Sequence, residues 1–181
     1  MARYTGPRKK YEKRFGLIEG GEKMRKKSPY GLRLEEKQKV KFVYGVLDRQ
    51  LRRYAKEALR ETNPPISLLR KLETRFDNVV FRLGFTLSRA HARQLISHNK
   101  FNLNGKKHNI SSHLLKEGDE LMLQPQMMDN FQVQEALEKS KNLPLPSWLW
   151  KEKNKAKILS LPSDDELPKE YKMDWVISFF V

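Results

Sequence analysis

Residues 75–110 read RFDNVVFRLGFTLSRAHARQLISHNKFNLNGKKHNI, and their pattern decides the fold of the central part of the chain. Apolar residues from Phe76 to Leu83 recur at helical spacing, and Gly84 provides a stop for this first helix. Ser88 is then placed to cap a second helix, which turns Ala92, Leu95 and Ile96 inward. The stretch therefore predicts two short consecutive helices.

Strands are predicted directly after these helices. Phe101 and Leu103 alternate with Asn102, and the dipeptide Asn104-Gly105 readily adopts the positive φ angles of a two-residue hairpin turn. A second turn at Gly118-Asp119 precedes the apolar residues 120–123. We predict a compact module over residues 75–125 in the order helix, helix, several strands.

The region before the module has a helical pattern beginning at Tyr30. One face is apolar and is predicted to be core, and the other carries cations that we expect to face outward. Gly45 predicts a bend or break, and Thr62-Asn63-Pro64-Pro65 predicts a connection, after which Ile66–Leu72 resumes a helix. The apolar stripe is Val40, Val43, Tyr44, Leu47, Leu51, Tyr54 and Ala58, and the cations are Lys37, Lys41, Arg49, Arg52, Arg53, Lys56 and Arg60.

Residues 1–29 are rich in Lys and Arg and have little apolar periodicity. We expect that this segment does not fold alone. It is either a solvated tail or an arm that becomes ordered along an RNA backbone, where phosphates offset its self-repulsion.

The overall charge indicates a polyanionic partner. The 181 residues include 37 Lys and Arg against 22 Asp and Glu, a formal net charge of +15, and no Cys. Residues 1–60 hold 19 basic and 7 acidic side chains, whereas residues 126–181 hold 8 and 9. Nucleic acid is the partner most typical of such a composition, and the last third is better suited to structural or protein contacts. Without Cys, and without His and carboxylates at ligand spacing, we assign no metal and no cofactor.

Within the module, several cations are predicted to converge on one basic edge. Arg89 and Arg93 are one helical turn apart, and His98, Asn99, Lys100, Lys106 and Lys107 follow. Guanidinium groups can hold phosphates with two hydrogen bonds each. The alternative is that the two arginines lie over their helix and reach solvent.

Three stretches resemble the family of small-subunit ribosomal protein four, in that family's order. They are ARYTGPRKKYEKRFG (2–16), YGLRLEEKQKVKFVYGVLDRQLRRYAKEA (30–58) and the module itself, which alone would resemble only a small RNA-binding domain shared with RNA-modifying enzymes. The resemblance implies an α+β fold with a helical first domain and an inserted second domain of antiparallel sheet plus helices. The implied segments are a basic arm (1–29), a helical domain (30–74), the inserted domain (75–162, core 75–125) and a C-terminal segment (163–181) that returns to the helical domain.

The same resemblance implies a function. It implies a structural constituent of the small ribosomal subunit that binds its RNA first, nucleates assembly, contacts ribosomal protein five, supports accuracy and lines the mRNA entry side. The expected RNA-binding residues are Arg3, Tyr4, Arg8, Lys9 and Arg14 in the arm, Lys37, Lys39, Lys41, Arg49 and Arg52 in the helix, and Arg89, Arg93, His98, Lys100 and Lys106 in the module.

This sequence departs from the family pattern at three places. Leu17–Pro29 is shorter than in many relatives, and Phe42 stands where a second basic residue is usual, which predicts the loss of a phosphate contact. The end reads Val176-Ile177-Ser178-Phe179-Phe180 instead of a pattern containing an acidic residue. Because Trp175–Val181 is apolar on both faces, we expect it to be buried.

Other functions are weighed against this one. Arg75-Phe76-Asp77 is similar to a pseudouridine synthase motif, but no segment is long enough for a catalytic domain, so we expect no enzyme. A free RNA-binding protein or an accessory to an rRNA-modifying enzyme is the alternative. We expect no membrane partner and no independent homo-oligomer. Because the resemblance begins at Ala2, we expect no cleaved targeting segment, and either a cytoplasmic ribosome or an organellar one whose gene lies in the organelle.

Overall fold

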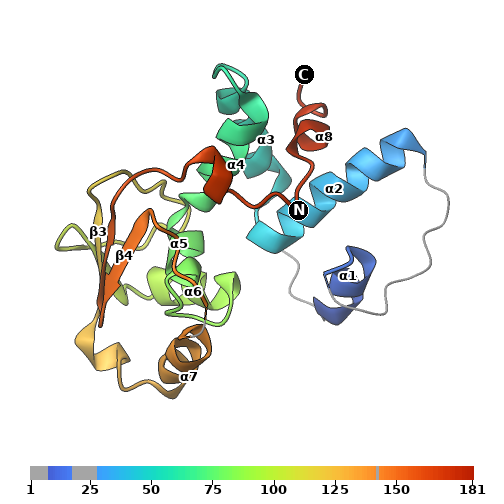
Figure 1. The fold of residues 1–181 in the computed structure, drawn as a ribbon. Coiled ribbons are helices and arrows are strands. Elements are labelled where there is room, and N and C mark those ends of the chain that lie inside the picture. The colour runs from blue at the N-terminus through green and yellow to red at the C-terminus, as the bar shows by residue number, and fades with distance from the viewer. Residues whose placement is uncertain (1–7, 18–27, 142) are drawn as a thin grey trace. The chain divides into compact units, whose positions relative to one another are not determined.

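The computed structural model of the protein describes residues 8–17, 28–141 and 143–181. The chain divides into two compact units (Figure 1). One contains the described residues up to Leu69 together with Pro168–Val181, and the other is Arg70–Leu167. The first unit is therefore built from both ends of the chain. Across the described residues, no helix combines the length and apolar character needed to cross a membrane.

The first unit is helical. Its helices are α1 (Arg8–Arg14), α2 (Pro29–Tyr44), α3 (Asp48–Ala58) and α8 (Met173–Ile177), and α4 (Pro64–Glu73) leads into the second unit. Ser28 caps α2 by accepting a hydrogen bond from the Gly31 N–H. The predicted break at Gly45 is confirmed, because this residue ends α2 with a φ of 57°. The buried side chains of α3 are Leu51, Tyr54, Ala55 and Ala58.

Helix α4 begins earlier than predicted. The connection was expected to extend through Pro65, but the helix starts at Pro64. A proline fits the first turn of a helix because the N–H groups there have no intrahelical partner. The two prolines therefore start the helix.

Helix α8 of the C-terminal segment packs against α2. Met173, Val176 and Ile177 of α8 are buried, and the Lys172 N–H donates to Glu36 Oε1 at 3.1 Å. The expectation that the whole end is buried is wrong at Val181, which is 93% exposed. Burial stops where α8 ends.

In the second unit, the predicted helix pair is confirmed as α5 (Phe76–Arg82) and α6 (Arg89–Ser97). Gly84 follows α5 with a φ of 71°, and the Ser88 hydroxyl accepts from the His91 N–H at the start of α6. Later helical elements are η1 (Pro125–Met127), α7 (Phe131–Ser140) and η2 (Asp164–Glu166).

A five-stranded antiparallel sheet lies against α5 and α6 (Figure 1). Its strands, in the spatial order β2-β1-β3-β5-β4, are β1 (Phe101–Leu103), β2 (Lys106–Lys107), β3 (Glu120–Leu123), β4 (Leu149–Glu152) and β5 (Lys155–Ile158). The Asn104-Gly105 hairpin is confirmed, with φ angles of 50° and 78°. Phe101 and Leu121 of the sheet share one core with Phe76, Val80 and Ile96 of the helices.

The arm contains a helix that the sequence analysis did not predict. In α1, Tyr11 stacks on Phe42 of α2 with ring centroids 5.4 Å apart, and Phe15 lies 5.7 Å from the same ring. Phe15 is buried. Phe42 therefore anchors the arm helix, which is a role that its description as a lost phosphate contact did not anticipate.

Candidate nucleic-acid interface

Helix α3 presents a row of exposed cations. Its buried residues face the interior of the first unit, and the exposed cations at positions 49, 52, 53 and 56, with Arg60 two residues beyond the end of the helix, point to solvent. Arg49 and Arg52 lie where they were expected. Arg53 is 62% exposed at its side chain and only 3.8 Å from Glu57, so this surface ion pair restrains it weakly. We call Arg49, Arg52, Arg53, Lys56 and Arg60 the α3 basic row.

Helix α1 adds a second group of exposed cations. Lys9, Lys10, Lys13 and Arg14 are exposed, while Tyr11 and Phe15 on the other side hold the helix to α2. Arg8 lies with its guanidinium carbon 5.4 Å from the centre of the Phe42 ring. Arg8, Lys9 and Arg14 are thus at the surface as expected, and Arg3 and Tyr4 lie outside the described residues.

The lysines of α2 differ from the expectation. Lys37 and Lys41 place their ammonium groups 3.2 and 3.0 Å from Asp48 Oδ1, and the Lys37 side chain is only 14% exposed. Lys37 also lies 5.0 Å from the Phe179 ring centre. The expectation that Lys37 faces outward is wrong, because Asp48 at the start of α3 and the C-terminal aromatic residues take up its charge.

The same contacts change the pKa of Asp48. Burial alone raises the pKa of its carboxyl group, but hydrogen bonds and charge from Lys41 and Lys37 outweigh burial, so the pKa lies below the ordinary value. Lys39 in turn donates to the backbone oxygen of Glu170 at 3.4 Å and lies 5.4 Å from the Tyr171 ring centre. The three expected lysines of α2 therefore fasten parts of the first unit to one another.

Arg89 and Arg93 of α6 also turn toward the protein. Arg93 Nε donates to Asp77 Oδ2 at 2.7 Å and its side chain is 13% exposed. Arg89 Nε donates to Asn78 Oδ1 at 2.7 Å, with its guanidinium carbon 4.5 Å from the Phe81 ring centre. The expectation that this pair is directed outward is wrong in this respect. For Arg93 the physical reason is Asp77, whose buried carboxylate requires positive partners, whereas Arg89 is held by Asn78 and the Phe81 ring.

Asp77 belongs to a buried charged network at the base of the module. Arg75 donates to it twice, at 3.0 and 2.7 Å, and the two side chains are 0% and 1% exposed. Glu73 similarly accepts from Asn78 at 2.8 Å and from Arg82 at 2.9 Å. A carboxylate held in this way is not available as a catalytic group, which agrees with discounting the Arg75-Phe76-Asp77 motif.

The remaining module residues lie around an open hollow of about 620 Å³. His98 and Lys106 are exposed and Lys100 is half-buried. Asn99, with a φ of 56°, accepts a hydrogen bond from Gln124 through its backbone oxygen at 2.9 Å, which fixes the loop after α6. The lining residues are His98, Asn99, Lys100, Lys107, Gln124, Pro125 and Gln126, and Lys106 lies outside this set.

The arrangement can bind phosphates but offers no assembled catalytic group among the residues described. Over the same part of the chain, no cluster of three or more His, Asp or Glu side chains could hold a metal ion. Of the three neighbouring carboxylates near the end, Asp164 pairs with Arg70 at 2.7 Å and Glu166 closes the cap of η2 on Ser163. Exposed guanidinium and ammonium groups are the usual partners of an RNA backbone.

Sequence reasoning missed residues that support the interface. Tyr11 and Phe15 are spaced as neighbours on one helical turn, a signal that predicts an apolar contact for α1. The sequence analysis considered Phe42 only as the replacement of a basic residue. Its aromatic side chain is the signal that it could pack against another apolar side chain. Asp77 gives no such signal for its contact with Arg93, which forms only when α5 and α6 are folded together.

Comparison with known proteins places these features in context. The family model described as "Ribosomal protein S4/S9 N-terminal domain" matches residues 8–73, and the family model described as "S4 domain" matches residues 74–121. The chain is 39% identical over 202 residues to "Small ribosomal subunit protein uS4" of Rubrobacter xylanophilus, 40% over 206 residues to the protein of that name in Dictyoglomus turgidum, and 39% over 201 residues to that in Akkermansia muciniphila. Each comparison covers 99% of this chain and 99% of the relative.

Proposed function

Because the chain belongs to the small ribosomal subunit protein uS4 family, we propose that it is an RNA-binding structural constituent of the small ribosomal subunit. This family is one of structural ribosomal proteins and not of enzymes. The named relatives come from bacteria, which supports a ribosome of bacterial type.

The observation that carries the proposal is the α3 basic row. Four cations lie along one exposed side of a helix whose other side is core, with Arg60 just beyond its end, and a merely solubilising face would mix the two signs more evenly. Phosphates along folded RNA match such a row, and the exposed cations of α1, with His98, Lys100 and Lys106 of the module, extend the set. Lys37 and Lys41 instead form ion pairs with Asp48, and Arg93 forms one with Asp77, within the protein.

Salt dependence tests this assignment. A variant with Arg49→Gln, Arg52→Gln and Lys56→Gln loses three of the proposed phosphate contacts. Binding of the full chain to small-subunit ribosomal RNA is measured across salt concentrations. The negative slope of log K against log salt should become shallower by about 2 to 3, since each contact contributes about −0.7 to −0.9 to it.

A matched control removes the same charge elsewhere. Lys139→Gln, Lys153→Gln and Lys155→Gln also delete three exposed cations, here lysines of α7 and the β4–β5 hairpin. This control should keep nearly the original slope. Equal slopes for the two triple variants would contradict the α3 basic row as the RNA contact, provided that circular dichroism shows both variants folded.

We further propose a place in assembly and decoding. As the family resemblance implies, the protein would bind the ribosomal RNA before other proteins, nucleate assembly, contact ribosomal protein five, support accuracy and line the mRNA entry side. A primary binder must bind protein-free ribosomal RNA and stay with small subunits through a high-salt wash. Binding that requires other ribosomal proteins to be added first would contradict the nucleating role.

A further inference from the structure

The open hollow in the second unit lies at one end of the five-stranded sheet. Strand β1 begins there at Phe101, directly after the loop that follows α6. Its two antiparallel neighbours end at the same place. Lys107, the last residue of β2, lies opposite Asn102, and Leu123, the last residue of β3, ends its strand opposite the start of β1. Three segments of the chain therefore contribute side chains to one concave surface of about 620 Å³.

Hydrogen bonds hold the walls of the hollow in place. The backbone N–H of Gln124 donates to the Lys100 oxygen at 3.0 Å, and its side-chain nitrogen donates to the Asn99 oxygen at 2.9 Å. The Met127 N–H donates in turn to the Gln124 oxygen at 2.9 Å. The loop after α6 and the segment after β3 are thus joined, and the hollow is formed before any ligand arrives.

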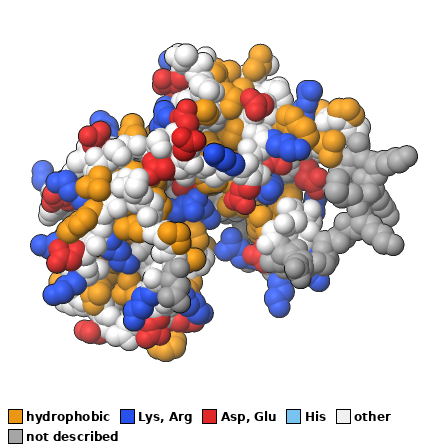
Figure 2. Space-filling view, viewed as in Figure 1, with side chains coloured by type: hydrophobic (Ala, Val, Ile, Leu, Met, Phe, Trp, Pro, Cys, Tyr) orange, Lys and Arg blue, Asp and Glu red, His pale blue; other side chains and the backbone are white. Residues whose placement is uncertain are grey.

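The charged groups that line the hollow are positive. Lys100 and Lys107 supply two ammonium groups, and His98 supplies an imidazole ring. Within the part of the chain that the structure describes, no Asp or Glu lines the hollow, and no ion pair or hydrogen bond holds either ammonium group. Elsewhere on this unit both signs of charge are mixed, as the left part of Figure 2 shows. The hollow therefore attracts an anion, and no lining carboxylate competes for its cations.

Amide side chains suit the hollow to a nucleobase as well as to a phosphate. Asn99, Gln124 and Gln126 all line it. A side-chain amide offers a hydrogen-bond donor and an acceptor, which are the groups that the edges of bases display. The exposed His98 ring provides a face on which a base can stack. A phosphate alone would leave these groups unused, whereas hollows of about 300–1,000 Å³ are typical of sites for small organic ligands.

Unpaired nucleotides are the part of an RNA that can enter such a hollow. In an A-form duplex the bases are stacked, and the deep major groove does not admit side chains. Bases in loops and bulges can instead be splayed out, stacked on a ring and hydrogen-bonded along their edges. The α3 basic row can contact only the backbone of the RNA, so the hollow adds a different kind of contact.

We propose that the hollow binds one unpaired nucleotide of the small-subunit ribosomal RNA. The two lysines hold its phosphate, and the amides of Gln124 and Gln126 bind its base. This inference rests on the proposed function and deepens it, because it assigns recognition of a base to one site of a protein whose other contacts are with phosphates.

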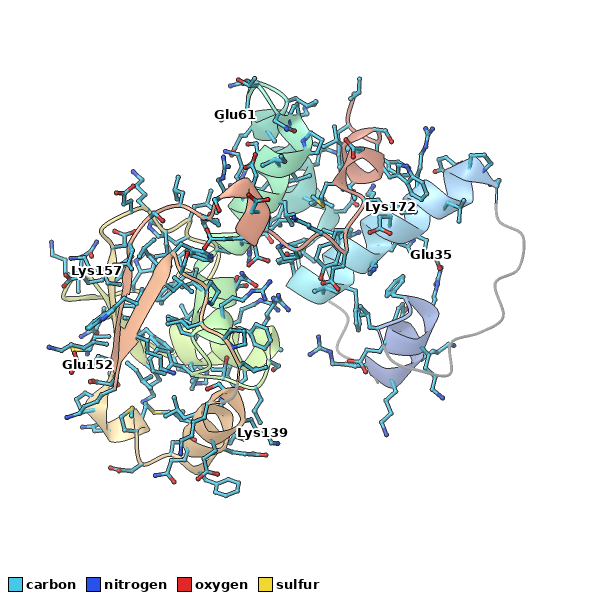
Figure 3. The ribbon with its side chains drawn as sticks, in the orientation of Figure 1. Glu35, Glu61, Lys139, Glu152, Lys157 and Lys172 are labelled. Atoms are coloured by element: carbon cyan, nitrogen blue, oxygen red, sulfur yellow. The ribbon has the colours of Figure 1, made fainter. Side chains whose placement is uncertain are left out.

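Chemical probing of protein-free small-subunit ribosomal RNA bound to the full chain tests the proposal. Base-specific reagents report which base edges the protein covers, and hydroxyl radicals report which backbone positions it covers. The hollow variant is Lys107→Gln with Gln126→Ala, which leaves Gln124 and its hydrogen bonds in place. The matched control is Lys139→Gln with Gln134→Ala, which removes the same two groups from exposed positions of α7, the helix that carries Lys139 in Figure 3.

All chains are compared at saturating protein concentration, after both variants are shown to melt at the temperature of the unmodified chain. The unmodified chain should protect the base edge of an unpaired nucleotide. The hollow variant should lose that protection and keep the backbone protections elsewhere, and the control should lose neither. If the unmodified chain protected no part of the RNA, the proposed function would fail. Base protections that are the same in the hollow variant and the control, or lost only at paired nucleotides, would overturn the nucleotide site alone.

A second measurement changes the RNA instead of the protein. A ribosomal RNA fragment carries an abasic site at the nucleotide that probing identifies, so the phosphate stays and the base is removed. The unmodified chain should bind this RNA about tenfold more weakly than the intact fragment, because stacking and edge hydrogen bonds are lost. The hollow variant should lose less than about twofold, since part of that contact is already absent. Equal losses for the two chains would mean that the base is bound elsewhere, which would overturn the proposal.

Discussion

Asp77 shows how a single buried charge decides the orientation of its neighbours. Arg75, two residues before it, and Arg93, sixteen residues after it, both donate to its carboxylate. Removing one member of a buried charged group leaves the others in a poorly solvating environment, which costs more than the intact group contributes. The orientation of Arg93 in α6 therefore depends on an acid in α5.

We expect Asp77→Asn to lower the free energy of unfolding by about 3–5 kcal/mol, because Arg75 and Arg93 lose their negative partner. Urea unfolding followed by circular dichroism measures the change. The comparison variant is Asp164→Asn, since Asp164 pairs with Arg70 at a similar 2.7 Å but is 59% exposed. Its loss should cost about 1 kcal/mol or less. Equal costs for the two variants would contradict the structural role of Asp77.

The same residues mark a limit of sequence reasoning. Helical spacing placed Arg93 on the side of α6 opposite its buried residues, and an arginine there is normally directed to water. The partner that draws it inward lies on another helix, and that distance in sequence hides the contact. Where both partners are local, as in the cap of Ser88 on His91, the sequence predicted the contact correctly.

At the scale of elements, the sequence predicted those that carry their own signals. Apolar spacing and Gly45 predicted α2 and α3, and Asn104-Gly105 predicted the hairpin of β1 and β2. Helix α1 has seven residues, five of them Lys or Arg, and a helix of that length is not stable by itself in water. Its stability comes from Phe42, 27 residues beyond Phe15, so no local pattern reveals it.

Phe42→Lys should release α1 from α2. The substitution removes the ring against which Tyr11 and Phe15 pack and adds a charge beside Arg8, while the interior of the first unit is left in place. Hydrogen exchange of the amides of residues 12–15, which are the ones that helix α1 protects, should accelerate at least about tenfold, which corresponds to the loss of about 1.4 kcal/mol. Amides in α3 should exchange at their original rates.

Phe131→Lys serves as the control for a Phe replaced by a charge. Phe131 begins α7 and is 76% exposed, so its replacement should leave exchange in α1 unchanged. If Phe42→Lys also left α1 protected, the anchoring of the arm by Phe42 would be disproved.

The whole molecule is organised around a chain that leaves its first unit and comes back to it. The middle residues, Arg70–Leu167, form their own unit with the sheet and its core. The return of the C-terminal residues was an expectation from family resemblance, because nothing in the local pattern of residues 168–181 identifies α2 as their partner. The burial of Val176 and Ile177 against the first unit gives that return a physical basis.

This organisation predicts that the two units lose stability separately. Val176 is 0% exposed in α8, which packs on α2, so Val176→Asp buries a carboxylate without a partner and should destabilise the first unit by about 3–5 kcal/mol. Hydrogen exchange should become faster in α2 and α3 but not in β1 and β3, whose core lies within residues 70–167. Ser178→Asp, at an exposed position just after α8, should change neither unit measurably. Equal acceleration in the sheet and in α2 would mean that the chain unfolds as one cooperative body, and that the C-terminal segment stabilises all of it.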